Sequence, residues 1–189
     1  MKYLNLATIR ECTESEGPGK RFVLWTQGCL KRCINCCNPE MQEIKKMAIV
    51  SVEDIINRIQ IAVEQHGIEG VTFVGGEPFL QAESLSIVAE WCRKNNLSVL
   101  VFTGYTLDEI QNEIIPCSNK LLAATDILVD GEFDYKNIDA ERSWVGSTNQ
   151  SVHLLTNFYT KGIEYKDANR KIEFIFDNSK LHINGWPYL

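Results

Sequence analysis

Short apolar runs alternate with stretches of helical periodicity through the first two thirds of the chain. Residues 22–25, 71–74, 97–102 and 127–129 are apolar and rich in β-branched side chains, which predicts four buried strands. Strands that alternate with helices favour a parallel sheet with right-handed crossovers. Glycine or polar residues follow most of these strands, and ligands of parallel α/β folds bind at that edge.

Two helices between these strands have clear start signals. Ser51 precedes Asp54, and Thr106 precedes Glu109, at the three-residue spacing of a capping box. Another helix is expected over residues 85–91. Apolar residues recur at helical spacing behind Ser51, at Val52, Ile55, Ile56, Ile59 and Val63.

The last third of the chain has a different pattern. Residues 142–150 form a polar stretch, and residues 152–155 read as one short strand. Residues 171–176 and 180–183 predict two strands around a turn at Asp177 and Asn178, which is a hairpin and not another strand–helix unit.

Composition narrows the class of protein. The chain has 189 residues, 44% of them hydrophobic, so we expect a single globular domain. Its net charge of −6 argues against a nucleic-acid surface. It has neither a secretory signal pattern nor an apolar run of about eighteen residues, so neither secretion nor a membrane span is expected.

Cysteine is the residue type that points to chemistry. The chain has seven cysteines, an odd number that does not suit a disulfide framework. Cys29, Cys33 and Cys36 lie within eight residues, and clustered thiols in a reducing compartment are typically metal ligands or catalytic groups. A cytoplasmic location is therefore expected.

The spacing of these three cysteines favours an iron–sulfur cluster. Three thiolates on one short loop hold three corners of a [4Fe–4S] cubane and leave one iron open to a reactant. The alternative is a structural zinc site, but zinc ligands are usually paired as C-x-x-C and there is no second pair. The fourth zinc ligand would come from Cys37, His66, His153 or His182.

The cysteine loop also resembles a known signature. Residues 27–36 are similar to the cluster motif of the radical S-adenosylmethionine superfamily. Further stretches resemble the activating proteins of anaerobic ribonucleotide reductase and other glycyl-radical enzymes, in the same order over about the first 150 residues. These stretches are residues 16–21, 75–81, 103–105, 126–133 and 144–150.

The resemblance implies a reaction and its cofactors. A reduced [4Fe–4S] cluster on Cys29, Cys33 and Cys36 would cleave S-adenosylmethionine to a 5′-deoxyadenosyl radical, which abstracts hydrogen from a substrate. The protein would position the reactants, exclude water and tune the cluster. No second cluster motif is present, so the expected electron donor is an external flavodoxin or ferredoxin.

The resemblance also implies cofactor-binding residues. Gly75, Gly76, Glu77 and Pro78 would bind the methionine ammonium, through glycine carbonyls and the following carboxylate. The backbone at Asn35, Cys36 and Cys37 would run beside the adenine, although many relatives have an aromatic residue at the position of Asn35. Thr103 and Asp130 resemble positions that line the ribose and carboxylate, and a monovalent cation beside Asp130 is allowed. Residues 146–150 resemble a loop that contacts cofactor or partner, or else form a hydrogen-bonded turn.

These expectations define one fold and one leading function. The fold would be an α/β incomplete (β/α) barrel formed by a single radical S-adenosylmethionine domain, residues 1–189. Its core would cover about residues 20–155, and residues 156–189 would form an extension that completes the sheet, covers the mouth or docks a partner. The leading function is to install a glycyl radical on a partner enzyme such as anaerobic ribonucleotide reductase.

Two other functions share some of these features. A peptide-modifying enzyme or a 7-carboxy-7-deazaguanine synthase would have the same cluster and the same Gly75 to Pro78 motif. A non-catalytic iron–sulfur or zinc binding module would give Glu77 no role. Cys12, Cys92 and Cys117 belong to no motif, and the identity of the partner is not encoded in any motif.

Overall fold

The computed structural model describes residues 1–166, 171–177 and 180–185, and within them it has a seven-stranded sheet in the order β3-β1-β2-β4-β5-β6-β7. The strands of this sheet are β1 (Tyr3–Thr13), β2 (Arg21–Thr26), β3 (Ala48–Ser51), β4 (Gly70–Gly75), β5 (Ser98–Phe102), β6 (Ile127–Asp130) and β7 (Ser151–Leu154). The helices are α1 (Val52–His66), α2 (Ala82–Lys94), α3 (Leu107–Gln111) and α4 (Ser118–Ala123). The α/β class predicted from the alternation of strands and helices is confirmed.

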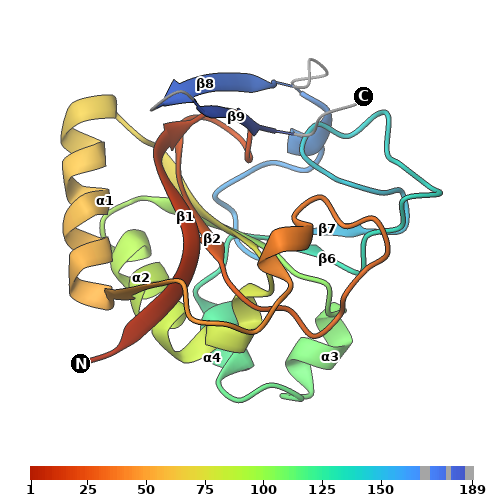
Figure 1. Ribbon diagram of the computed structural model, residues 1–189, viewed down its shortest axis with the longest axis horizontal. Coiled ribbons are helices and arrows are strands. Elements are labelled where there is room, and N and C mark those ends of the chain that lie inside the picture. The colour runs from red at the N-terminus through yellow and green to blue at the C-terminus, as the bar shows by residue number, and fades with distance from the viewer. Residues whose placement is uncertain (167–170, 178–179, 186–189) are drawn as a thin grey trace.

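The centre of the sheet is parallel and its margins are antiparallel. β2, β4, β5 and β6 pair in parallel, so their carboxyl ends meet at one edge. β1 pairs antiparallel with both β2 and β3, and β7 pairs antiparallel with β6. Figure 1 shows β1 and β2 running side by side past α1 and α2. The four strands predicted from apolar runs are the parallel ones.

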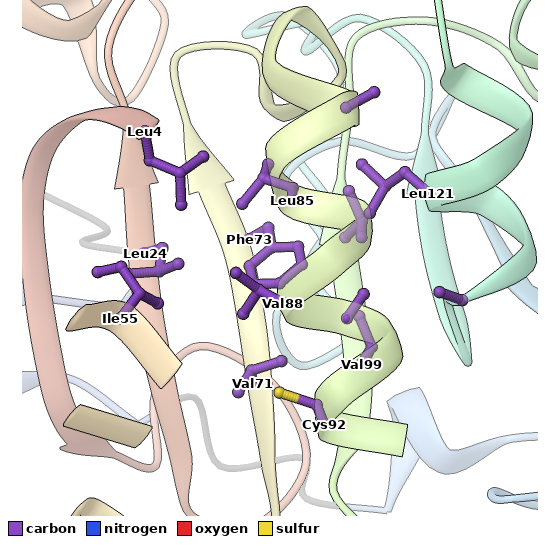
Figure 2. Close-up of a cluster of buried hydrophobic side chains, with 14 of the residues drawn as sticks. Leu4, Leu24, Ile55, Val71, Phe73, Leu85, Val88, Cys92, Val99 and Leu121 are labelled. Carbon is purple, nitrogen blue, oxygen red and sulfur yellow. The ribbon is translucent and has the colours of Figure 1, made fainter. Parts of the chain in front are cut away.

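The main hydrophobic core lies between the sheet and the helices. Phe22 and Leu24 of β2 and Val71 and Phe73 of β4 are fully buried there. Because successive strand residues point to opposite faces, Val23, Trp25 and Val74 form a separate cluster on the other face. Figure 2 shows Leu85, Val88 and Cys92 of α2 facing Val71 and Phe73 of β4. The helices thus cover one face and leave the other for a site.

Both predicted helix starts are present. The Ser51 side chain accepts a hydrogen bond from the backbone N–H of Asp54, and Thr106 forms a complete capping box with Glu109. The carboxylate of Glu109 accepts from the backbone N–H of Thr106 at 2.7 Å. α1 ends at Gly67, whose left-handed backbone (φ 63°) is the usual glycine stop.

The longest strand, β1, lies outside the predicted strands. Its sequence alternates apolar and polar residues, and Leu4 and Leu6 are buried while the charged residues nearer its end are not. This is the pattern of a margin strand with one covered face, which gives a weaker signal than a continuous apolar run. β3 is also unpredicted; it is only four residues long, and two of them are exposed.

A buried arginine closes the amino ends of the parallel strands. Arg21 is fully buried, and its guanidinium donates only to neutral oxygens. Its acceptors are the hydroxyls of Thr72, Ser98 and Tyr159 and the carbonyls of Pro18, Val71 and Ser98. Burial lowers the pKa of Arg21 from its usual value. Tyr159 links the chain after β7 to this end of the sheet.

The C-terminal part forms a separate two-stranded antiparallel ribbon, β8 (Glu173–Asp177) with β9 (Lys180–Asn184). Asn178, part of the predicted turn, lies outside the described residues. Figure 1 shows the ribbon crossing the end of β1 where that strand turns toward β2. Glu173 fixes it there, because its carboxylate accepts from the Thr13 hydroxyl at 2.5 Å and the Glu14 backbone N–H at 3.0 Å. No helix in the described ranges is long and apolar enough to cross a membrane.

Candidate active site

The parallel strands end around one cavity of about 620 Å³. Its lining comes from the loop after β2, the ends of β4 and β5, the segment after β6 and the end of β9. Eight of the residues predicted to bind cluster or cofactor line it: Cys29, Cys33, Cys36, Cys37, Gly75, Gly76, Glu77 and Thr103. Residues far apart in the sequence are thus brought together at the predicted edge of the sheet.

The three motif cysteines each face backbone N–H donors. The sulfur of Cys29 accepts from the N–H groups of Lys31 and Arg32, and that of Cys33 accepts from Phe133. The sulfur of Cys36 accepts from the N–H of Asn38 at 3.4 Å. Burial raises the pKa of Cys29 and of Cys33. N–H donors to sulfur stabilise thiolates bound to iron, and metal binding itself displaces the thiol proton.

Gly75 and Gly76 let the end of β4 pack directly against the cysteine loop. The N–H of Gly76 donates to Thr26 O, and the N–H of Glu77 donates to Gly28 O, both at 2.8 Å. A Cβ on Gly76 would lie 2.4 Å from Gly28 O, and Gly75 has a φ of 104°. Side chains at these two positions would therefore push the cysteine loop away from the sheet. The glycines set the site's geometry as well as leaving room for a ligand.

Glu77 is buried at the end of β4, with only 1% of its surface exposed. Its Oε1 accepts from Phe79 N–H at 3.0 Å and the Thr103 hydroxyl at 2.9 Å, and its Oε2 accepts from Gly104 N–H at 2.9 Å. Burial raises the pKa of Glu77 to about 7, against the opposing effect of these donors. A solvated glutamate in a plain turn is thereby excluded, and the carboxylate is held beside the cavity.

Lys31 is a site residue that the sequence analysis did not identify. Its Nζ lies 4.3 Å from the Tyr105 ring centre and pairs with Glu109 at 3.2 Å and Glu132 at 3.5 Å. Its stem packs on Gly104, where an added Cβ would lie 3.0 Å from Lys31 Cγ. Lys31 therefore ties the cysteine loop to the segment after β5. Its position between two motif cysteines was the only available signal.

Three predicted cofactor residues do not line the cavity. Asn35 is exposed in the cysteine loop with a φ of 53°, a left-handed conformation that asparagine tolerates well. Pro78 is buried as the first residue of a short 3₁₀ helix, Pro78–Gln81. Asp130 is buried, and its Oδ2 accepts from Leu107 N–H at 2.6 Å, while its Oδ1 lies 3.2 Å from His153 Nε2.

Residues 146–150 form a hydrogen-bonded turn that is also a wall of the cavity. Gln150 Oε1 accepts from the N–H groups of Gly146 and Ser147, and both Gly146 and Gln150 line the cavity. Arg142 holds the turn from behind, donating to the carbonyls of Ser147, Thr148 and Gln150 while pairing with Asp139 at 2.6 Å. Both interpretations of this segment are therefore compatible with its geometry.

The far wall of the cavity comes from the C-terminal ribbon. Ile183, Asn184 and Gly185 line it together with Glu16 from the β1–β2 connection. The Gly185 N–H donates to Glu16 Oε1 at 3.0 Å. Burial raises the pKa of Glu16 to about 7. The cavity thus has a second carboxyl of raised pKa, which begins the resembling stretch 16–21 but for which no role was predicted.

The residues considered for a zinc site are dispersed. His66 closes α1 and His153 faces Asp130, whereas the side chain of His182 lies outside the described part. Across the described ranges, no three Cys, His, Asp or Glu side chains converge tightly enough to hold a single metal ion. A cubane places each thiolate on a different iron, so it does not need such convergence.

Comparisons with known proteins find a family model and curated relatives that match this chain. Residues 15–153 match the family described as 4Fe-4S single cluster domain. The anaerobic ribonucleoside-triphosphate reductase-activating protein of Enterobacteria phage T4 is 26% identical over 153 residues, covering 79% of this chain and 93% of that protein. The protein of the same name from Vibrio cholerae serotype O1 is 30% identical over 155 residues, covering 74% of this chain and 91% of its own.

A lyase-activating enzyme and a solved structure also match. The pyruvate formate-lyase-activating enzyme of Staphylococcus epidermidis is 28% identical over 155 residues, covering 80% of this chain and 60% of that enzyme. Among solved structures, QueE from Escherichia coli has a TM-score of 0.41 at 20% identity, covering 55% of this chain and 53% of that one. That structural likeness is too weak to carry an argument.

Proposed function

The chain belongs to the 4Fe-4S single cluster domain family, and from that premise we propose that it is a radical S-adenosylmethionine activase of a glycyl-radical enzyme. The resemblance seen in its motifs is confirmed by relatives named as reductase-activating and lyase-activating proteins. Its cofactors are a [4Fe–4S] cluster and S-adenosylmethionine. Relatives of these names favour an activase over the other enzymes and over a non-catalytic binding module.

The observation that carries the proposal is the single cavity shared by three thiols and a buried carboxylate. Cys29, Cys33 and Cys36 are the proposed cluster ligands, and each accepts backbone N–H groups that would stabilise a bound thiolate. This donor set fits a cubane with one iron free of protein ligands. When bound, the cluster supplies the electron that splits S-adenosylmethionine into methionine and the 5′-deoxyadenosyl radical that abstracts a glycine hydrogen.

The chain's own residues bind S-adenosylmethionine, orient it and enclose it. Glu77 is placed to accept from the methionine ammonium, and Thr103 and Gly104 orient its carboxylate. Gly75, Gly76 and the backbone at Cys36 and Cys37 leave room for the cofactor beside the cluster loop. Asn35 and Pro78 act through the backbone shape of their turns, and Asp130 with His153 shapes the neighbouring wall, where a monovalent cation could sit.

The remaining parts of the proposal concern the whole protein. We assign residues 20–155 to the core of an incomplete (β/α) barrel and residues 156–189 to its extension, within one domain. The substrate is the glycine loop of a partner such as anaerobic ribonucleotide reductase, which accords with the relatives' names. A flavodoxin or ferredoxin supplies the electron in the cytoplasm, and neither nucleic acid nor a membrane takes part.

Anaerobic reconstitution tests the chemistry. Wild-type protein with iron, sulfide and a reductant should bind about one cluster and convert S-adenosylmethionine to 5′-deoxyadenosine. Cys33→Ala should lose both the cluster absorption and the product, because one corner of the cubane is no longer held. Cys12→Ala, which changes a cysteine that does not line the cavity, is the matched control. Retention of the cluster by Cys33→Ala would contradict the ligand assignment, and absence of 5′-deoxyadenosine from wild type would contradict the function.

A further inference from the structure

The C-terminal ribbon turns apolar side chains toward solvent. In its register Phe174 lies opposite Ile183 and Phe176 lies opposite Leu181, so the four side chains share one face. They are 63%, 42%, 79% and 50% exposed in that order. We call these four residues the outer face of the ribbon. Contiguous exposed apolar surface of this kind marks interaction sites, since a soluble antiparallel ribbon normally turns its apolar face inward.

On the opposite face of the ribbon, the two residues whose side chains are described are polar and packed inward. Glu173 and Asn184 lie opposite each other on it. Glu173 bonds to Thr13 and to the backbone of Glu14, and only 9% of Asn184 is exposed. Glu173 thus holds the ribbon on the sheet by polar contacts, while the four residues of the outer face remain 42% to 79% exposed. An isolated two-stranded ribbon is only marginally stable, so this arrangement calls for another surface on the outer face.

The outer face is continuous with the proposed active site. Ile183 belongs both to the outer face and to the lining of the cavity, and Asn184 and Gly185 line the cavity beside it. Asn184 Nδ2 is buried and has no hydrogen-bond partner in the described part of the chain. A buried amide without an acceptor is unfavourable, and a carbonyl group of a bound peptide would supply the missing acceptor.

We propose that the outer face of the ribbon is the docking surface for the glycyl-radical protein that the chain activates. This rests on the proposed function, which requires a glycine of a large partner to reach the cavity. The partner must then cover the surface next to the cavity, and the apolar groups of the outer face lie there. The family match ends at residue 153, so the ribbon lies outside the matched part of the chain. The partner would present apolar side chains to the ribbon and a peptide segment to Asn184.

The test measures binding to a purified partner. The probe is the anaerobic ribonucleoside-triphosphate reductase of the same organism, with dissociation constants measured anaerobically on reconstituted full-length protein. Phe174→Ser combined with Phe176→Ser should weaken binding about tenfold or more, as expected for buried aromatic anchors. Ile61→Ser is the matched control, because Ile61 is 46% exposed on α1, on the helix-covered face of the sheet. The glycyl-radical signal of the reductase should fall in parallel with binding.

Additional measurements separate the outcomes. Iron content and melting temperature show whether the variants are folded, and Leu181→Ser provides a milder change of the same face. If wild type forms 5′-deoxyadenosine but the variants bind the reductase normally, the docking proposal is wrong and the proposed function stands. If wild type forms no 5′-deoxyadenosine, the proposed function itself fails. Two other results would contradict the docking proposal if the double variant still binds the reductase normally. If wild type forms dimers and the double variant does not, the outer face is a dimer interface. If wild type binds anionic phospholipid vesicles and the double variant does not, the outer face is a lipid-binding surface.

Discussion

Two buried charged groups lie at opposite ends of the parallel strands, and they differ in what surrounds them. Arg21, at the amino ends, is enclosed by neutral oxygens and does not line the cavity. Glu77, at the carboxyl ends, is held by N–H and O–H donors from one side and lines the cavity. Burial lowers the pKa of Arg21 and raises that of Glu77 to about 7, so each charge is disfavoured by its site.

This contrast separates a structural charge from a functional one. The guanidinium of Arg21 joins the beginnings of three strands, because Val71 and Thr72 lie on β4 next to its own strand and Ser98 lies on β5 beyond it. Glu77 also bridges two strand ends, yet its carboxylate remains next to the space for a ligand. We therefore expect substitutions at Arg21 to affect unfolding and substitutions at Glu77 to affect ligand binding.

The largest expected effect is on stability, at the amino ends of the parallel strands. Arg21→Met keeps the length of the side chain but leaves buried hydroxyls and carbonyls without donors, at about 1–3 kcal/mol for each group left unsatisfied. We expect the free energy of unfolding to fall by about 3 kcal/mol or more, measured by urea denaturation of the cluster-free protein. Arg58→Met is the control, since Arg58 pairs with Glu11 at the surface. If the loss of unfolding free energy is no larger than that of Arg58→Met, the proposed structural role of Arg21 is wrong.

The next largest expected effect is on the affinity for S-adenosylmethionine, at the carboxyl ends of the parallel strands. Glu77→Gln preserves shape but replaces a charge-assisted bond to the methionine ammonium with a neutral one, so the dissociation constant for S-adenosylmethionine should rise about tenfold. Iron content should not change, because Glu77 is not a proposed ligand. Titration calorimetry on reconstituted protein measures the affinity, with Glu83→Gln on α2 as the control. If unfolding changes strongly and affinity does not, the two ends of the strands do not differ as we propose.

The raised pKa of Glu77 also predicts a pH dependence. Below about pH 7 the carboxyl is protonated in the free protein, and the affinity for S-adenosylmethionine should fall by up to about tenfold per pH unit. Stability should change in the opposite direction. A carboxyl that titrates near 7 when folded and near 4.5 when unfolded binds more protons in the folded state, so the unfolding free energy decreases as pH rises between these values.

Glu16 gives the control for this pH experiment, since its pKa is also raised to about 7 by burial. Glu16→Gln should reduce the pH dependence of stability but leave the pH dependence of cofactor affinity. Glu77→Gln should flatten the affinity profile and reduce, without abolishing, the pH dependence of stability, because Glu16 still titrates. An affinity profile that Glu77→Gln leaves unchanged would assign the titrating group to another residue.

The sequence predicted the functional end of the strands much better than the structural end. The cysteine spacing and the pairing of Glu77 with Gly75 and Gly76 are local patterns, and their placement on one cavity follows from the parallel strands alone. Arg21 lies in the resembling stretch 16–21, but its burial gave no signal, because all its acceptors except the Pro18 carbonyl lie some fifty to a hundred and forty positions away. Its burial depends on how the strands begin, which no local pattern records.

The distinction between local sequence patterns and contacts with distant residues also explains the other features that the sequence did not predict. β1 lies near one edge of the sheet and only part of one of its faces is buried, so the alternation of apolar and polar residues in its sequence is weak. Lys31 and Glu16 reach the site through contacts with Tyr105 and with Gly185, which lie far along the chain. The ribbon strands were predicted, but the inward placement of Glu173 depends on tertiary contacts with Glu14 and Thr13.

The smallest expected effects come from two hydroxyls that serve the two charges. Ser98 accepts from Arg21 at 3.0 Å, and Thr103 donates to Glu77 at 2.9 Å. Ser98→Ala should lower the unfolding free energy by about 1 kcal/mol and leave the pH profile of cofactor affinity in place. Thr103→Val keeps the shape but removes a donor that favours the ionised carboxylate, so the midpoint of that profile should move above about pH 7. If Thr103→Val leaves the midpoint in place while Ser98→Ala moves it, the assignment of one end to structure and the other to ligand binding is reversed.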